Sequence, residues 1–214
     1  MLKRSPFSVV YYSNGCAPEA LRRYCLRLLV HEASASGGEV VLVTWAPTPA
    51  QGCRQVIWPV HEANHQNLYR QILAGIELAS GRTILLAEHD VLYPPGYHTT
   101  MAKAAAGSIC FNTNVWRLSA KGYFRASRPH RLLSNCAGPR DTVERAISAK
   151  VTEVQRLGTP QRAEPDEGCE VSTTLPTVDV RHGQNFTGNR KPADGTYVKT
   201  IEYWASYTHY TKLM

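Results

Sequence analysis

Short apolar segments alternate along this chain with segments whose apolar residues recur at helical spacing. The runs "FSVVYY" (7–12), "EVVLVTW" (39–45) and "TILLA" (83–87) are typical of buried strands, with "QVIWPV" as a shorter one. Between them, apolar residues recur every three or four positions from Pro18 to Gly37 and from His65 to Ser80, which predicts two helices. Buried strands that alternate with helices imply a largely parallel sheet covered on both faces.

The second half of the chain continues this pattern less regularly. Helices are predicted over 97–106 and 139–155, and strands over 108–118 and 177–180. A length of 214 residues suits one domain, or one domain with a tail. We therefore predict a single α/β, Rossmann-like domain over 1–194, with an aromatic tail at 195–214 that packs on it.

Composition excludes several classes of protein. No apolar run approaches the ~18 residues that span a bilayer, and the N-terminus lacks the features of a signal peptide, so we expect a cytoplasmic protein without a membrane partner. The six cysteines form no CxxC pair, which predicts reduced thiols and argues against a zinc ribbon or a redox motif. These cysteines are Cys16, Cys25, Cys53, Cys110, Cys136 and Cys169.

Polar residues follow two of the predicted strands at the edge where open parallel sheets bind ligands. Ser13 and Asn14 come after the first strand, and Glu88-His89-Asp90 come after "TILLA". Glu88 and Asp90 alternate along the strand direction, so both can point to one side. Such oxygen ligands suit Mg²⁺ or Mn²⁺ shared with the phosphates of a substrate. The plainer interpretation is that these acids cap a turn or pair with basic residues.

A buried strand, an acidic triplet and then the aromatic-proline turn Tyr93-Pro94-Pro95 resemble the DxD region of nucleotide-sugar glycosyltransferases of the GT-A fold. The resemblance covers roughly 7–190. It implies that Asp90 ligates the metal ion, Mn²⁺ or Mg²⁺, that holds the diphosphate of the donor. Glu88 stands where Asp is usual, and its implied role is either metal ligation or contact with sugar hydroxyls.

The resemblance implies further donor contacts. His182, in a late polar loop, would be another metal ligand, although a single histidine is also compatible with packing. Arg181, Asn185 and Arg190 lie in the same loop, whose glycines let cationic groups approach a diphosphate. Three residues where the first strand passes into the following loop would face the nucleotide, most simply that of a UDP-sugar. These are Tyr12, Ser13 and Asn14.

Transfer with inversion needs a base that deprotonates the acceptor hydroxyl. In this family the acid usually begins a helix after the acceptor-side strand, and Asp141 occupies such a position, with Glu144 as the reserve. An acid in a first helical turn also complements the helix dipole, and a retaining enzyme would need neither residue as a base.

The net charge of +7 is concentrated in one segment, because 117–150 holds eight basic and two acidic residues. Its basic residues include Arg117, Lys121, Arg125, Arg128 and Arg131, interleaved with aromatic residues. This mixture favours contact with phosphates and bases, although a solvated basic face is the plainer interpretation.

The charge favours hydroxymethylated pyrimidine in DNA as the acceptor, as in the DNA-modifying glycosyltransferases of bacteriophages. A glycan or a small molecule is the alternative acceptor. Two other classes also remain open, a metal-dependent nuclease and a non-catalytic nucleic-acid-binding module.

Overall fold

The computed structural model describes residues 5–119, 123–126, 131–182, 197–198, 200–201, 203–204 and 210. In chain order its elements are β1 (Phe7–Ser13), α1 (Glu19–Ala35), β2 (Glu39–Thr44), β3 (Arg54–Ile57), α2 (His65–Leu78), β4 (Thr83–Glu88), β5 (Val91–Leu92), α3 (Tyr97–Ala104), β6 (Cys110–Asn112), β7 (Val115–Leu118), β8 (Phe124–Ala126), the 3-10 helix η1 (Leu133–Asn135), β9 (Cys136–Pro139), α4 (Arg140–Leu157), β10 (Cys169–Val171), β11 (Thr177–Val180) and β12 (Tyr197–Val198).

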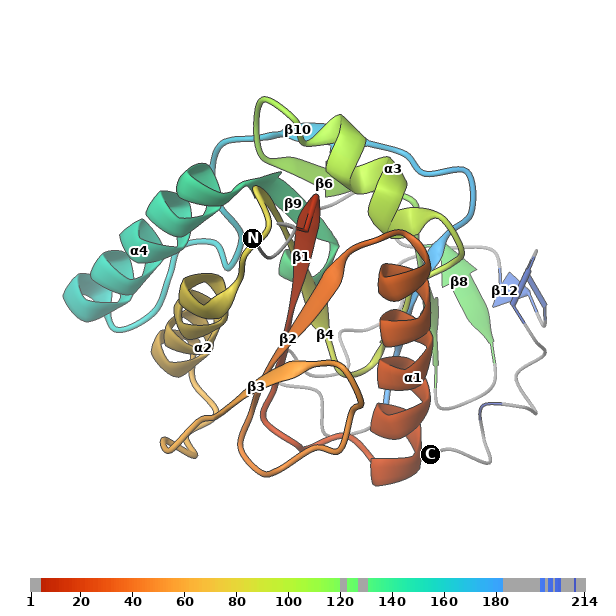
Figure 1. The fold of residues 1–214 in the computed structure, drawn as a ribbon, viewed down its shortest axis with the longest axis horizontal. Coiled ribbons are helices and arrows are strands. Elements are labelled where there is room, and N and C mark those ends of the chain that lie inside the picture. Colours follow the sequence, from red (N-terminus) through yellow and green to blue (C-terminus); the bar gives the residue numbers. More distant parts are fainter. Residues whose placement is uncertain are drawn as a thin grey trace.

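The central sheet has seven strands in the order β10-β6-β9-β4-β1-β2-β3. Strands β3, β2, β1 and β4 run parallel to one another, whereas β9 runs antiparallel to both β4 and β6 (Figure 1). The mostly parallel sheet that the strand–helix alternation predicts is thus confirmed. The single strand predicted over 108–118 is wrong, because it is broken into β6 and β7, which belong to different sheets.

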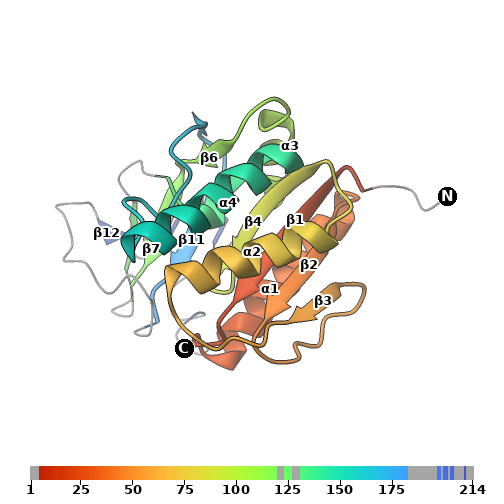
Figure 2. The same ribbon diagram turned by 90° about the vertical axis from the view of Figure 1, so that its left-hand side faces the viewer.

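Helices cover both faces of this sheet. Helices α2 and α4 lie side by side over one face (Figure 2), and α1 and α3 pack on the other. Strand β1 divides its side chains between the two layers, because successive residues of a strand point to opposite faces. Val9 and Tyr11 join the core cluster under α1 and α3, while Val10 and Tyr12 join the cluster under α2 and α4.

A second sheet, with strand order β12-β8-β7-β11-β5, packs against the opposite side of α1. The sequence did not predict it. A third core cluster lies between this sheet and α1, and it contains two buried aromatic residues of the 195–214 segment, Trp204 and Tyr210. The indole Nε1 of Trp204 donates a hydrogen bond to the carbonyl oxygen of Pro176, at 2.9 Å. The boundary between domain and tail stays a prediction.

Cys110 and Cys169 form a disulfide, so the prediction of reduced thiols is wrong for this pair. The two residues are 59 positions apart and meet only because β6 pairs with β10. The other four cysteines are not part of a disulfide. Among the described residues, none of the helices combines the length and the apolar character that crossing a bilayer requires.

Candidate active site

A cavity of about 170 Å³ opens at the carboxyl ends of β1 and β4, beside the second sheet. Loop residues from several separate parts of the chain line it, together with one side of α2. The lining includes Tyr12 and Ser13 at the end of β1, Asn14 and Cys16 after it, Trp45 after β2, Gln71 on α2, Glu88 at the end of β4, His89 and Asp90 after it, Asp179 in β11, and Arg181 and His182 after it. The two strand ends that the sequence singles out therefore do share one site.

The residues that follow β11, Arg181 and His182, are brought to this site because β11 pairs with the short strand β5. Directly after Asp90, β5 pairs antiparallel with β11, and Asp179 lies opposite Val91. The backbone N–H of Val180 donates to the carbonyl oxygen of Asp90, at 2.8 Å. This pairing brings His182 beside Asp90 although 92 positions separate them in the sequence.

Glu88 is a half-buried residue whose carboxyl group has few compensating partners. The hydroxyl of Tyr12 donates to its Oε1 at 2.9 Å, and the backbone N–H of Glu88 donates to the hydroxyl of Tyr93 at 3.3 Å. Burial and the neighbouring charge of Asp90 raise the pKa of Glu88 to about 8. The raised pKa favours the protonated form of Glu88, whose neutral carboxyl can donate a hydrogen bond as well as accept one.

Asp90 is the ionised carboxylate of this pair. Its Oδ2 lies 3.3 Å from Nε2 of His182, and its side chain is only 9% exposed. Burial alone would raise the pKa of Asp90, but His89 and His182 outweigh that effect and lower it below its usual value. A carboxylate oxygen and an imidazole nitrogen thus lie together at the edge of the cavity, as a metal site would require.

A group of charged residues continues the site along β11. The guanidinium of Arg181 lies 2.6 Å from Oδ2 of Asp179, and Nε of Arg117 lies 3.6 Å from the same oxygen. Arg181 lines the cavity, and its contact with a diphosphate stays a prediction. Arg117 faces Asp179 and is not among the residues that line the cavity.

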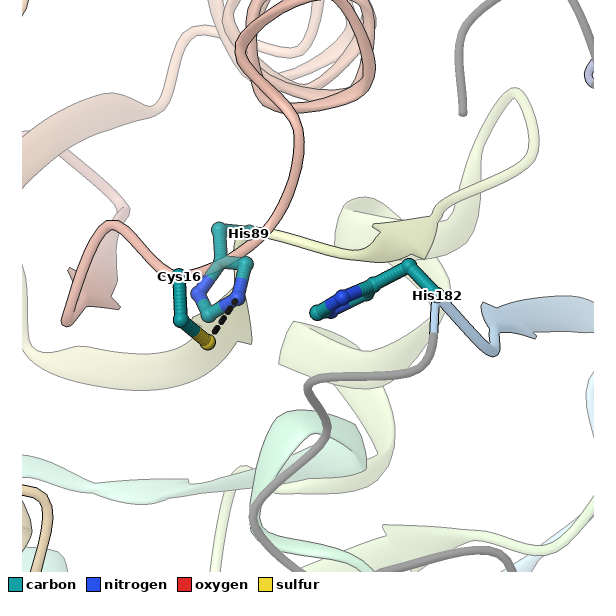
Figure 3. A group of neighbouring side chains, drawn as sticks. All are labelled: Cys16, His89 and His182. Atoms are coloured by element: carbon teal, nitrogen blue, oxygen red, sulfur yellow. Dashed lines mark hydrogen bonds between the residues drawn. The ribbon is translucent and has the colours of Figure 1, made fainter.

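The loop after β1 is shaped by its own side chains. Oγ of Ser13 accepts a hydrogen bond from the backbone N–H of Gly15, and Oδ1 of Asn14 accepts one from that of Cys16. Gly15 has a φ of +73°, a left-handed conformation that glycine adopts without steric cost. The turn directs Cys16 toward His89, with Sγ 3.8 Å from the Nε2 of that ring (Figure 3).

The sequence reasoning missed a number of residues that line the cavity, among them Cys16, Trp45, Gln71, His89 and Asp179. Trp45 Nε1, Gln71 Nε2 and His89 Nδ1 are buried and have no hydrogen-bond partner in the part of the chain that the structure describes. Trp45 follows β2 at the ligand edge, so the strand-end rule could have found it. Gln71 could have been noticed as a polar residue on the buried face of α2.

The structure does not bring Asp141 or Glu144 to the cavity. Strand β9 runs antiparallel to β4, with Pro139 opposite Thr83, the first residue of β4. Helix α4 therefore begins at the opposite edge of the sheet, about 16 Å from Glu88 at ~3.3 Å per strand residue. Both acids are exposed there, and Asp141 lies at the start of the helix, where it complements the dipole.

The described part of the basic segment does not form one continuous basic face. The guanidinium of Arg131 donates to the carbonyl oxygens of Asp166 and Gly168, at 2.7 and 2.8 Å. Lys150 is only 4% exposed and pairs with Glu153 and with the side chain of Asp166.

Two more arginines of the segment occupy different places. Arg140 donates to backbone carbonyls near the end of α2, at the edge of the sheet far from the cavity, and Arg125 belongs to β8. Four predicted site residues lie outside the described residues: Lys121, Arg128, Asn185 and Arg190.

No family model and no curated protein matches the sequence. Among solved structures, residues 1–349 of S. aureus TarS in complex with UDP-GlcNAc match with a TM-score of 0.51 and 10% identity, over 85% of this chain and 60% of that one. The same TarS segment in a second structure matches with a TM-score of 0.50 and 8% identity, over 81% of this chain and 60% of that one. The chain shares its fold with TarS.

A looser match is to a protein from Desulfovibrio desulfuricans G20 that carries a provisional assignment as a nucleotide-diphospho-sugar transferase. Its TM-score is 0.44 at 8% identity, over 82% of this chain and 83% of that one. The present chain spans 60% of the length of the TarS segment. At these identities the likeness concerns the fold.

Proposed function

We propose that this chain is a glycosyltransferase that binds a nucleotide-sugar, most simply a UDP-sugar, and moves the sugar to an acceptor hydroxyl. The observation that carries the proposal is the convergence of Glu88, Asp90 and His182 on one cavity at the carboxyl edge of the sheet. TarS, which has the same fold, was solved with UDP-GlcNAc bound. Open α/β sheets bind their ligands at this edge.

The nucleobase is proposed to lie at the α2 side of the cavity. Trp45 and Gln71 line that side, and each has a buried nitrogen donor without a partner among the described residues. A buried donor without a partner is costly, and the carbonyl oxygens of uracil would satisfy such donors. Tyr12, Ser13 and Asn14 line the same cavity and are the nucleotide contacts that the sequence predicts.

The diphosphate is proposed to lie between Asp90 and Arg181, where the cavity meets β11. Asp90 and His182 would hold Mn²⁺, which accepts both oxygen and imidazole ligands, whereas Mg²⁺ prefers an all-oxygen site. When bound, such an ion neutralises charge that develops on the departing diphosphate. Glu88, whose pKa is raised by burial, is placed to hydrogen-bond a sugar hydroxyl. Asn185 and Arg190 remain proposed diphosphate contacts.

The acceptor proposed from the charge is hydroxymethylated pyrimidine in DNA, which would fit a bacteriophage enzyme in the cytoplasm of its host. Its support is the excess of basic residues between 117 and 150. The internal contacts of Arg131, Arg140 and Lys150 weaken that support. The disulfide between Cys110 and Cys169 is of a kind that is rare in reducing compartments. A glycan or small-molecule acceptor requires neither a basic surface nor a reducing compartment.

Calorimetry tests the donor proposal, with UDP-GlcNAc titrated into the protein in the presence and absence of Mn²⁺. We expect binding that depends on the metal, and a gain of about 2.7 kcal/mol in unfolding free energy when the ligand is present at 100 times its Kd. Absence of binding by UDP-GlcNAc and by other UDP-sugars, together with Mn²⁺-dependent cleavage of plasmid DNA, would instead establish the nuclease alternative.

A second assay separates the acceptors. Labelled donor is offered to duplex DNA containing 5-hydroxymethylpyrimidine, to the same duplex with unmodified pyrimidine, and to a panel of glycans. Transfer to the modified duplex alone supports the DNA acceptor. Transfer to a glycan, with none to DNA, excludes the DNA acceptor and leaves the glycosyltransferase in place.

A further inference from the structure

Three side chains with nitrogen or sulfur ligand atoms meet at the border of the cavity, each from a different loop. Cys16 follows β1, His89 follows β4 and His182 follows β11. Figure 3 shows the ring of His182 pointing toward the pair formed by Cys16 and His89. One potential ligand atom from each of the three lies within 4.8 Å of the others.

These separations suit a single small ion. Zinc binds sulfur at ~2.3 Å and imidazole nitrogen at ~2.0–2.1 Å, so two ligands of a tetrahedral site stand about 3.5 Å apart. Cys16 Sγ and His89 Nε2 are already 3.8 Å apart. A weak thiol–imidazole hydrogen bond would account for that pair alone. The pairing of β5 with β11 brings His182 to the same place, and its ring centre lies 5.9 Å from that of His89.

We propose that Cys16, His89 and His182 bind Zn²⁺, and that the fourth coordination position faces the cavity that all three residues line. One thiolate and two imidazoles favour zinc over Mg²⁺, which prefers oxygen. Three protein ligands with one open position are typical of zinc sites that act on a bound molecule. On binding, the S–H bond of Cys16 breaks, its proton passes to solvent and the zinc–sulfur bond forms.

The contact between Asp90 and His182 also supports this assignment. Its Oδ2 lies 3.3 Å from Nε2 of His182, and a carboxylate in that position commonly orients a histidine ligand. His182 is also the imidazole that we assign to the donor's metal ion. Zinc in the three-residue site should therefore compete with Mn²⁺ in the Asp90–His182 site, and this consequence alone rests on the proposed function.

Cobalt serves as the spectroscopic probe for the site. Tag-free wild-type protein is titrated with Co²⁺ in the absence of nucleotide. We expect one equivalent to bind with a thiolate-to-cobalt charge-transfer band and the intense visible bands of tetrahedral cobalt, and one equivalent of Zn²⁺ to displace it. Cys16→Ser should abolish the thiolate band and weaken zinc binding by at least ~10-fold, the loss seen even for residues that only support a ligand.

Cys53→Ser is the matched control, because Cys53, like Cys16, is a half-buried cysteine without a disulfide, but it lies outside the cluster. It should keep both the band and the affinity. Protection of the Cys16 thiol from alkylation by Zn²⁺ in the wild type, followed by mass spectrometry, gives a measurement that needs no variant. A cobalt complex without a thiolate band, or a band that persists in Cys16→Ser, overturns the proposal. Zinc binding without UDP-GlcNAc binding would leave this site standing and remove the proposed function, and the reverse result would do the opposite.

Discussion

Two glutamates at opposite edges of the central sheet meet very different surroundings. Glu39 begins β2 at the amino edge, where its carboxylate accepts hydrogen bonds from Ser8 and Ser80 and pairs with Arg54. Glu88 ends β4 at the carboxyl edge, where its carboxyl accepts one hydrogen bond from Tyr12 and lies near the charge of Asp90.

Their pKa values shift in opposite directions. Burial opposes ionisation of Glu39, but the hydrogen bonds from Ser8 and Ser80 and the pairing with Arg54 outweigh it and lower its pKa to about 2. Burial dominates at Glu88 and raises its pKa to about 8. At the amino edge, the chain therefore supplies the partners of its own carboxylate, and Glu39 has a structural role. At the carboxyl edge it leaves polar groups facing a cavity, as sites for ligands do.

The largest effect on donor binding is expected from Asp90→Asn, at the carboxyl edge of the sheet. Loss of the carboxylate should weaken Mn²⁺-dependent binding of UDP-GlcNAc by ~100-fold or more, since even residues that only support a metal ligand cost ~10–100-fold. The unfolding free energy of the variant should stay close to that of the wild type, because the substitution also removes the cost of burying a charge. Calorimetry and chemical denaturation measure the two quantities. Unchanged donor affinity in the folded variant would remove Asp90 from the metal site.

A smaller loss of donor binding is expected from His182→Ala, which keeps the carboxylate of Asp90 in place. We expect at least ~10-fold weaker binding of UDP-GlcNAc, measured at limiting Mn²⁺. Wild-type affinity under the same conditions would show that His182 only packs against the site.

At the amino edge, Glu39→Gln should cost stability and leave donor binding intact. A hydrogen bond to a charged group contributes about 1.5–3 kcal/mol, and the side chain of Glu39 is 21% exposed, so we expect a loss of about 1–3 kcal/mol in urea denaturation. Weaker binding of UDP-GlcNAc in this variant, at a temperature where it stays folded, would contradict the division between the two edges.

The two glutamates should also contribute to the pH dependence of stability with opposite signs. Glu39 has a lowered pKa, so its stabilisation is present above pH ~4.5 and is lost as the pH falls toward about 2. Glu88 has a raised pKa, so the folded state binds more protons between pH ~4.5 and about 8, and its contribution declines as the pH rises through that range. Glu39→Gln should flatten the acid limb of the stability curve, and Glu88→Gln should flatten the decline toward pH 8. Parallel curves for both variants and the wild type would show that neither shift is present.

The smallest effect is expected from Asp141→Asn, at the edge far from the cavity. Turnover should stay at the wild-type level, and stability should fall by only about 0.3–1 kcal/mol through the lost interaction with the helix dipole. Glu144→Gln provides a matched exposed control on the same helix. A variant at position 141 that binds donor normally but does not turn over would restore Asp141 as the base and contradict the arrangement of the two edges.

Periodicity and strand ends in the sequence were sufficient to predict the main elements and the edge that carries the site. The apolar runs before Ser13 and Glu88 mark buried parallel strands, because such strands are covered on both faces and need apolar residues at every position. The acids after the second of these runs therefore had to lie at the carboxyl edge. These features are local, and any fold that buries the two strands side by side preserves them.

Strand pairing across long sequence separations was decided only by the tertiary structure. The antiparallel direction of β9 carries Asp141 to the wrong edge, and the pairing of β5 with β11 brings His182 to Asp90. The approach of Cys16 to His89 likewise depends on how the loops after β1 and β4 pack together. Such pairings follow from the summed packing of the whole core, and no single segment encodes which strand will lie next to it or in which direction it will run.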